Sequence, residues 1–190
     1  MIQTIIYFLT IIILAFITGL VVKYSDYLED VKKEKNKRKL VSLGLIYGIL
    51  IFLMVYYFPV VAPIWIGTIL GLIIFGKIDA VSHNVGVTIA ITLSLAFAQG
   101  FLGLLLVFFV VINILEELVN DYFDKNKLKN KLLQKIIISR PLLEVSAFLV
   151  SLISGFWEIW VAIFFFDIAY QLITKYENKI INSLKKSKKS

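Results

Sequence analysis

The stretch Ser25-Asp26-Tyr27-Leu28-Glu29-Asp30 decides the expected fold, because a similar stretch returns half a chain length later. Asn120-Asp121-Tyr122-Phe123-Asp124-Lys125 follows at an offset of 95 residues (121 − 26 = 95) in a chain of 190. Each copy comes after a long apolar run and before a lysine-rich segment. We interpret the two copies as parts of a duplicated unit that brings acidic residues out of a membrane twice, on the same side.

The composition is that of a membrane protein. Hydrophobic residues make up 59% of the chain and charged residues 17%, whereas a soluble domain has apolar content nearer one half and charge nearer one quarter. Several apolar runs reach the roughly 17 to 25 residues that a helix needs to cross the bilayer. We therefore predict an all-α, polytopic transmembrane helix bundle. The absence of cysteine excludes disulfides and thiolate metal sites.

The net charge of +7 is concentrated in short segments between the apolar runs. This distribution favours anionic lipid headgroups over nucleic acid as the partner, because nucleic-acid-binding domains spread their basic residues over a folded face. Under the positive-inside rule, all basic segments should face the cytoplasm. We expect a multi-pass protein of the cell membrane with its N-terminus outside, its C-terminus cytoplasmic and a homo-oligomer as one assembly option.

About seven spans satisfy that rule. The first three are expected at 2–22, 40–58 and 64–76, and the fourth and fifth at 85–98 and 101–118. The last two share the run 141–174, which we divide near Ser154-Gly155 because it is too long for one crossing. The run 85–115 is divided near Gln99-Gly100 for the same reason, although a single tilted helix is the alternative.

A second landmark supports the duplication, since Ile64-Trp65-Ile66 and Ile159-Trp160-Val161 also lie 95 residues apart. The expected organisation is a first three-span repeat (1–84, with a basic loop at 23–39), a linker span (85–98), a second repeat (99–174, with a basic loop at 121–140) and a basic tail (175–190). This 3+1+3 layout with parallel repeats resembles the SWEET sugar transporters in topology. The Pro-Gln signature of that family is missing.

Acidic residues of both copies are candidate ligands of Mg²⁺, a hard cation that takes few protein oxygens and completes its shell with water and phosphate. They are Asp26, Asp30, Asp79, Asp121 and Asp124. His83, the one imidazole of the chain, is a candidate proton carrier, and Lys77 a candidate phosphate ligand. Asp79 and His83 would share one face of a helix. Alternatively, the acids balance neighbouring lysines at solvated helix ends.

Two further acids lie within the expected spans or at the end of one. Asp167 lies among phenylalanines, and Glu144 lies at the mouth of the sixth span. An ionisable group inside a span is costly, which suggests a transport site or a buried charge pair. The alternative is a purely structural ion pair for Asp167.

Asn120-Asp121-Tyr122-Phe123-Asp124 resembles the first aspartate motif of the ubiquinone-type intramembrane prenyltransferases. In that family, two acidic motifs hold Mg²⁺ and an isoprenoid diphosphate at the cytoplasmic side. The resemblance covers five residues. Beyond them, Leu128 occupies the position at which the family has a further acid. It implies a Mg²⁺-dependent enzyme acting on a phosphate- or diphosphate-bearing lipid at the cytoplasmic leaflet.

Two other functions stay open at this point. The chain could be a small-solute or cation transporter or channel, with its halves moving about a site near Asp167. It could also be a structural or assembly protein without a catalytic site.

Overall fold

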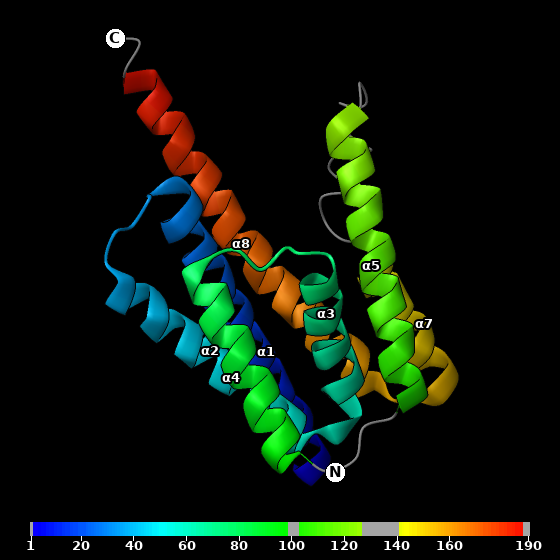
Figure 1. Cartoon of the computed structure of the whole chain (residues 1–190). Coiled ribbons are helices and arrows are strands. Elements are labelled where there is room, and N and C mark those ends of the chain that lie inside the picture. Colours follow the sequence, from blue (N-terminus) through cyan, green and yellow to red (C-terminus); the bar gives the residue numbers. More distant parts are fainter. Residues whose placement is uncertain (1, 99–102, 127–140, 188–190) are drawn as a thin grey trace.

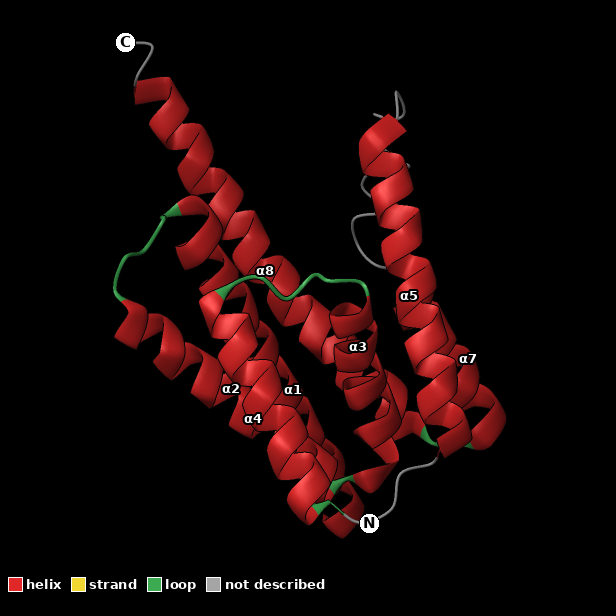
Figure 2. Ribbon diagram, viewed as in Figure 1, coloured by secondary structure: helices red, strands yellow, loops and turns green. Residues whose placement is uncertain are grey.

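The computed structural model describes residues 2–98, 103–126 and 141–187, and side chains within them except those of 124–126 and 178–187. These residues form seven α-helices and no strand (Figures 1 and 2). The helices are α1 (Ile2–Asp26), α2 (Lys37–Tyr57), α3 (Ala62–Ile74), α4 (Val81–Phe97), α5 (Gly103–Asn126), α7 (Pro141–Ser154) and α8 (Trp157–Ser187). A π-helical turn, η1 (Tyr27–Val31), continues α1, and a 3₁₀ turn (Pro59–Val61) precedes α3.

Both long apolar runs, 85–115 and 141–174, are interrupted, as the sequence predicts. The first run is divided between α4, which ends at Phe97, and α5, which begins at Gly103. The second is divided between α7 and α8, where Gly155 has a φ of 79°. Glycine adopts this left-handed conformation without the steric cost that a Cβ would add. The single tilted helix considered for 85–115 is therefore wrong.

Four helical segments are long and apolar enough to cross a membrane: Ile2–Val31, Lys37–Tyr57, Gly103–Phe123 and Trp157–Glu177. Three apolar segments are shorter, at Pro59–Ile74, Val81–Phe97 and Pro141–Ser154. At 1.5 Å per residue, a 14-residue helix such as α7 extends about 21 Å, less than the roughly 30 Å of a hydrocarbon core. The helix lengths thus support a membrane protein and leave the number of complete crossings open.

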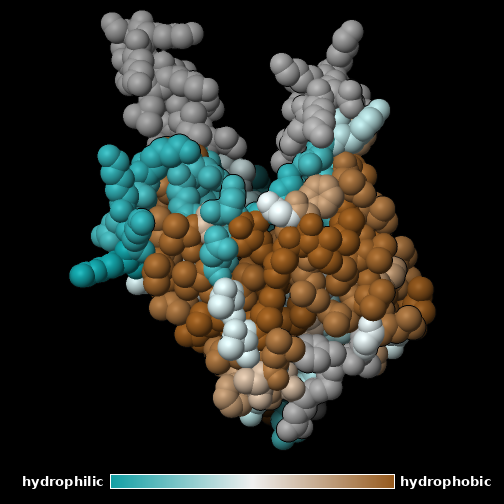
Figure 3. Space-filling view, in the orientation of Figure 1, coloured by the Kyte–Doolittle hydropathy of each residue, from teal (hydrophilic) through white to brown (hydrophobic). Residues whose placement is uncertain are grey.

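Successive helices run in alternating directions, so that the ends of α1, α3, α5 and α8 lie at the upper end of the bundle in Figure 1. Figure 3 shows hydrophilic residues gathered at this end and an apolar surface over most of the remaining face. Large apolar side chains are exposed on several helices, among them Leu104 (87%) and Ile153 (85%). Such an extensive apolar surface is rare on soluble monomers and is expected for a surface that contacts lipid.

Three helix pairs form the interior: α2 with α4, α1 with α8, and α3 with α5. Small residues allow close approach in each pair. A Cβ at Gly86 would overlap the Tyr47 ring, one at Gly19 would lie 2.3 Å from the Phe166 carbonyl oxygen, and one at Gly71 would lie 2.5 Å from Asn113 Oδ1. Small residues at crossings are typical of membrane bundles, where packing replaces the hydrophobic effect between helices.

We predict that Gly19→Ala destabilises the protein by about 1–3 kcal/mol, because the new methyl group meets backbone atoms of α8 that cannot rotate away. The measurement is thermal unfolding of the purified chain in detergent. Gly103→Ala is the matched control, since a Cβ there would have none of the described atoms beyond its own chain neighbours within 4 Å. Equal unfolding temperatures for the two variants would contradict the α1–α8 packing.

Candidate functional site

Asp26, the last residue of α1, joins three helices at the hydrophilic end of the bundle. Its Oδ1 lies 2.7 Å from Nε2 of His83 on α4, and its Oδ2 accepts a hydrogen bond of 2.8 Å from the Tyr170 hydroxyl on α8. Lys23, one turn earlier, lies 3.7 Å from Oδ2 and 3.6 Å from Glu177 Oε2. The Asp26 side chain is 11% exposed. Such charge-assisted hydrogen bonds are about twice as strong as neutral ones.

His83 is bonded at both ring nitrogens. Its Nδ1 lies 3.1 Å from the hydroxyl of Tyr47 on α2, and that hydroxyl donates to the Ser82 carbonyl oxygen at 2.9 Å. The tyrosine proton is thereby used, so the phenol oxygen can accept from Nδ1–H while Nε2–H donates to Asp26. A doubly protonated, positively charged imidazole satisfies every partner in this arrangement. The Asp26–His83 cluster, defined as Asp26, His83, Tyr47 and Tyr170, therefore connects α1, α2, α4 and α8.

Glu29, in the π-helical turn, caps the start of α4 from a distant part of the chain. Its Oε1 accepts the backbone N–H of Ser82 at 3.0 Å, and its Oε2 accepts the Ser82 hydroxyl at 3.1 Å. Ala80, the local N-cap residue, has no side chain that could accept such a bond. Because helix N-terminal N–H groups need acceptors and favour negative charge, Glu29 fixes where α4 begins.

Lys77, in the connection between α3 and α4, forms the second acid–base pair. Its ammonium lies 2.6 Å from Asp121 Oδ1 on α5, and the two side chains are 40% and 34% exposed. The connection at 75–80 thus contacts the second acidic stretch at Lys77, and the first turn of α4 that follows it contacts the first acidic stretch through Ser82 and His83. Four residues singled out from the sequence, Asp26, Lys77, His83 and Asp121, occur as two bonded pairs on either side of one short connection.

The structure places the other candidate residues elsewhere. Asp30 is exposed on the π-helical turn, and Asp79 is exposed before the first residue of α4. Asp79 and His83 therefore do not share a helix face as expected, because α4 begins only at Val81. Glu144 and Asp167 are half-buried on α7 and α8. The Asp124 side chain lies outside those described.

No three His, Asp or Glu side chains lie close enough to hold a metal ion in the described ranges 2–98, 103–126 and 141–187. Asp26 and Asp121 each bond a cationic partner on a different element. The magnesium site stays a prediction.

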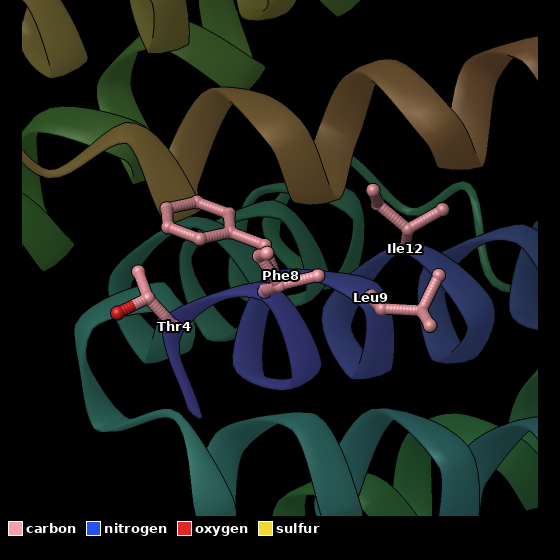
Figure 4. Close-up of a pocket in the computed structure, with 5 residues that line it drawn as sticks. Thr4, Phe8, Leu9 and Ile12 are labelled. Atoms are coloured by element: carbon pink, nitrogen blue, oxygen red, sulfur yellow. The ribbon is translucent and has the colours of Figure 1, made fainter. Parts of the chain in front are cut away.

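Two apolar hollows lie along α1. One, of about 320 Å³, is lined by residues of its first turns, including Phe8 and Ile12, at the end far from Asp26 (Figure 4). The other, of about 170 Å³, lies between the end of α1 and α8 and is lined by Tyr24, Tyr27, Ile173, Tyr176 and Glu177. This second hollow, called the tyrosine hollow below, is next to the Asp26–His83 cluster, because Tyr27 follows Asp26 and Glu177 pairs with Lys23.

Sequence reasoning missed the partners that hold the candidate residues. Tyr47 and Tyr170 are two of nine tyrosines, and neither stands in a polar context that would single it out. Glu116 was also missed. It is 1% exposed on α5 and accepts the N–H of Leu142 at the start of α7. The pair Glu116-Glu117, directly after the long apolar run 85–115, was the available signal, because an ionisable group beside the hydrocarbon core usually has a bonded partner.

Comparison of the chain with protein-family models, with curated proteins and with solved structures finds no match.

We predict a coupling free energy of about 1–3 kcal/mol between Asp26 and His83, because each supplies the other's charged hydrogen-bond partner. The measurement is a double-mutant cycle of Asp26→Asn, His83→Gln and the double variant, using chemical unfolding in detergent micelles. Asp79→Asn with His83→Gln is the control cycle, and its coupling should be near zero because Asp79 is exposed and off the helix. Additive effects in the first cycle would show that the pair is not formed.

Proposed function

We propose that the protein is a membrane-bound enzyme that acts on a phosphate- or diphosphate-bearing lipid, such as an isoprenoid one, at the hydrophilic end of the bundle. The observation that carries the proposal is that two acid–base pairs, Asp26–His83 and Lys77–Asp121, lie at the same end of the bundle, one towards each end of the α3–α4 connection (Figure 1). These residues are far apart in sequence and of the types that bind phosphate and divalent cations.

The charges of the two pairs match the charges of a metal–phosphate group. Without a substrate, the carboxylate of each pair is neutralised by its own cationic partner, which offsets the cost of placing the charge next to the apolar interior. A lipid phosphate would take Lys77 and His83 as partners, and Asp121 and Asp26 would then be available to hold Mg²⁺, with Asp30, Asp79 and Asp124 nearby in sequence. When bound, the metal would supply neutralisation of phosphate negative charge.

The surroundings of Asp26 suit a lipid. The tyrosine hollow offers an apolar recess near the end of α1 that carries this carboxylate. Tyrosine is favoured at membrane interfaces because its ring is apolar and its hydroxyl is polar. A phosphate at the Asp26–His83 cluster would leave the hydrocarbon part of the same molecule next to this recess. His83 is then positioned to move a proton, since both its nitrogens belong to a hydrogen-bond chain.

The seven-span 3+1+3 layout is part of the same proposal. Under the offset of 95, α1, α2 and α3 correspond to α5, α7 and α8, and α4 is the linker. The contacts support this correspondence, because α1 packs on α8 and α3 packs on α5, as exchange of the halves requires. Asp26 and Asp121 also correspond, and each bonds a residue at or just after the third helix of the other half.

A transporter is the second candidate, and the exchanged packing of the halves is the observation that favours it. Parallel repeats related by an axis along the membrane normal occur in transporters that rock about a central site. In that case Asp167 on α8 would be the residue that binds the solute or proton. The acid–base pairs would then close one side of the bundle.

We predict that Mg²⁺ together with inorganic pyrophosphate raises the unfolding temperature of the purified protein, and that Lys77→Ala and Asp121→Asn each weaken this binding about tenfold or more. Loss of one charged hydrogen bond accounts for that factor. The measurement is the ligand-induced shift, taken relative to each variant without ligand. Glu158→Gln, at the opposite end of α8, is the control and should bind as the wild type does.

A wild-type protein that shows no such shift, or variants that keep all of it, would remove the enzyme proposal. If, in addition, Asp167→Asn altered proton uptake into vesicles containing the protein, transport would become the better reading.

We predict that single cysteines at Lys33 and Ser187 are labelled from one side of sealed vesicles, and that those at Tyr57 and Ser154 are labelled from the other. The natural chain contains no cysteine, so each substitution reports one position. Labelling of Lys33→Cys and Ser187→Cys from opposite sides would contradict the seven-span arrangement.

A further inference from the structure

The segment from Lys32 to Lys39 is the second part of the expected basic loop 23–39 and is called the basic loop from here on. It carries six cationic side chains and one acid, Glu34. Lys32, Lys33, Lys35, Lys37 and Arg38 are exposed, and Lys39 is half-buried with its ammonium 5.7 Å from the centre of the Tyr24 ring. The loop lies between two candidate spans, Ile2–Val31 and Lys37–Tyr57. Its position is therefore fixed at the boundary between the apolar surface and the hydrophilic end.

Hydrogen bonds hold this loop in one conformation. The Glu34 N–H donates to the Leu28 carbonyl at 2.9 Å, and Glu34 Oε1 accepts the Asn36 N–H at 3.0 Å. Asn36 in turn caps α2 by accepting the Lys39 N–H at 3.3 Å. The pKa of the Glu34 carboxyl is lowered, first by the hydrogen bond from Asn36 and also by Lys39 and Lys32. Glu34 thus stays ionised as a local anchor, and most of the positive charge is left uncompensated.

The placement of these cations is unfavourable for the isolated helix. Lys37, Arg38 and Lys39 occupy the first turn of α2, where no acidic residue is present. Cations at a helix N-terminus oppose the helix dipole and destabilise the helix. An anionic surface facing the loop would offset this cost and the mutual repulsion of the side chains.

We propose that the basic loop binds anionic phospholipid headgroups of the adjacent leaflet. Basic residues next to a span are attracted to such headgroups over a distance of about one Debye length. The loop meets this condition permanently, because its two ends are continuous with membrane-spanning segments. The proposal is independent of the proposed enzyme activity, since none of the loop residues belongs to the acid–base pairs.

The test uses the full-length chain in phosphatidylcholine vesicles that contain a minor fraction of phosphatidylglycerol. A fluorophore on Ser42→Cys, one turn into α2, reports energy transfer to acceptor-labelled phosphatidylglycerol or, separately, phosphatidylcholine. Wild-type loop sequence should prefer phosphatidylglycerol. Replacing Lys32, Lys33, Lys35, Lys37 and Arg38 by Gln should reduce that preference about tenfold or more, and added salt should do the same.

The control variant replaces Lys185, Lys186, Lys188 and Lys189 of the tail by Gln, which removes a similar charge and keeps the loop. It should retain the preference at Ser42. No preference in the wild-type loop, or equal loss in both variants, would overturn the proposal. So would tighter binding of a single-stranded oligonucleotide than of phosphatidylglycerol vesicles, because the loop would then be a nucleic-acid surface.

Discussion

The hydrogen-bonded carboxylate of Asp26 is the interaction on which the arrangement of the helices depends. Most of the remaining contacts are apolar, and lipid tails are as apolar as leucine, so the hydrophobic effect alone does not tell one helix neighbour from another. The hydrogen bonds of Asp26 with His83 of α4 and Tyr170 of α8 specify these two helices as neighbours of α1. Glycines such as Gly19 and Gly86 then let the selected helices approach closely.

The connection between α3 and α4 also links the first half of the chain to the second half by polar contacts. Lys77 bonds Asp121 on α5, while Ser82 and His83 bond Glu29 and Asp26 at the end of α1. A short polar segment thereby ties both acidic stretches to one element. Asp26 bonds Tyr170 and Asp121 bonds Lys77, so each of these carboxylates has a partner in the other half of the chain.

The sequence predicted features that depend on length and on isolated charge. The divisions of 85–115 and 141–174 followed from the thickness of a bilayer, and Gly155 marked one of them. Asp26, His83, Lys77 and Asp121 were identifiable because charged residues are scarce in so apolar a chain. The start of α4 was not predictable, because its cap is Glu29, 53 residues before Ser82. Tyr47 and Tyr170 were missed because nothing in their local sequence separates a bonded hydroxyl from an interfacial one.

The two signs of charge have different places in this molecule. Carboxylates such as Asp26, Glu29 and Glu116 lie inward, where they accept hydrogen bonds from other helices and fix helix ends. The lysines and arginine of the basic loop lie outward, with few protein partners. Helix N-termini within the bundle offer N–H donors that only acceptors can satisfy, so acids are useful there. Bases are unsuited to that position, because a cation opposes the positive end of the helix dipole, and most of those in the basic loop are exposed instead.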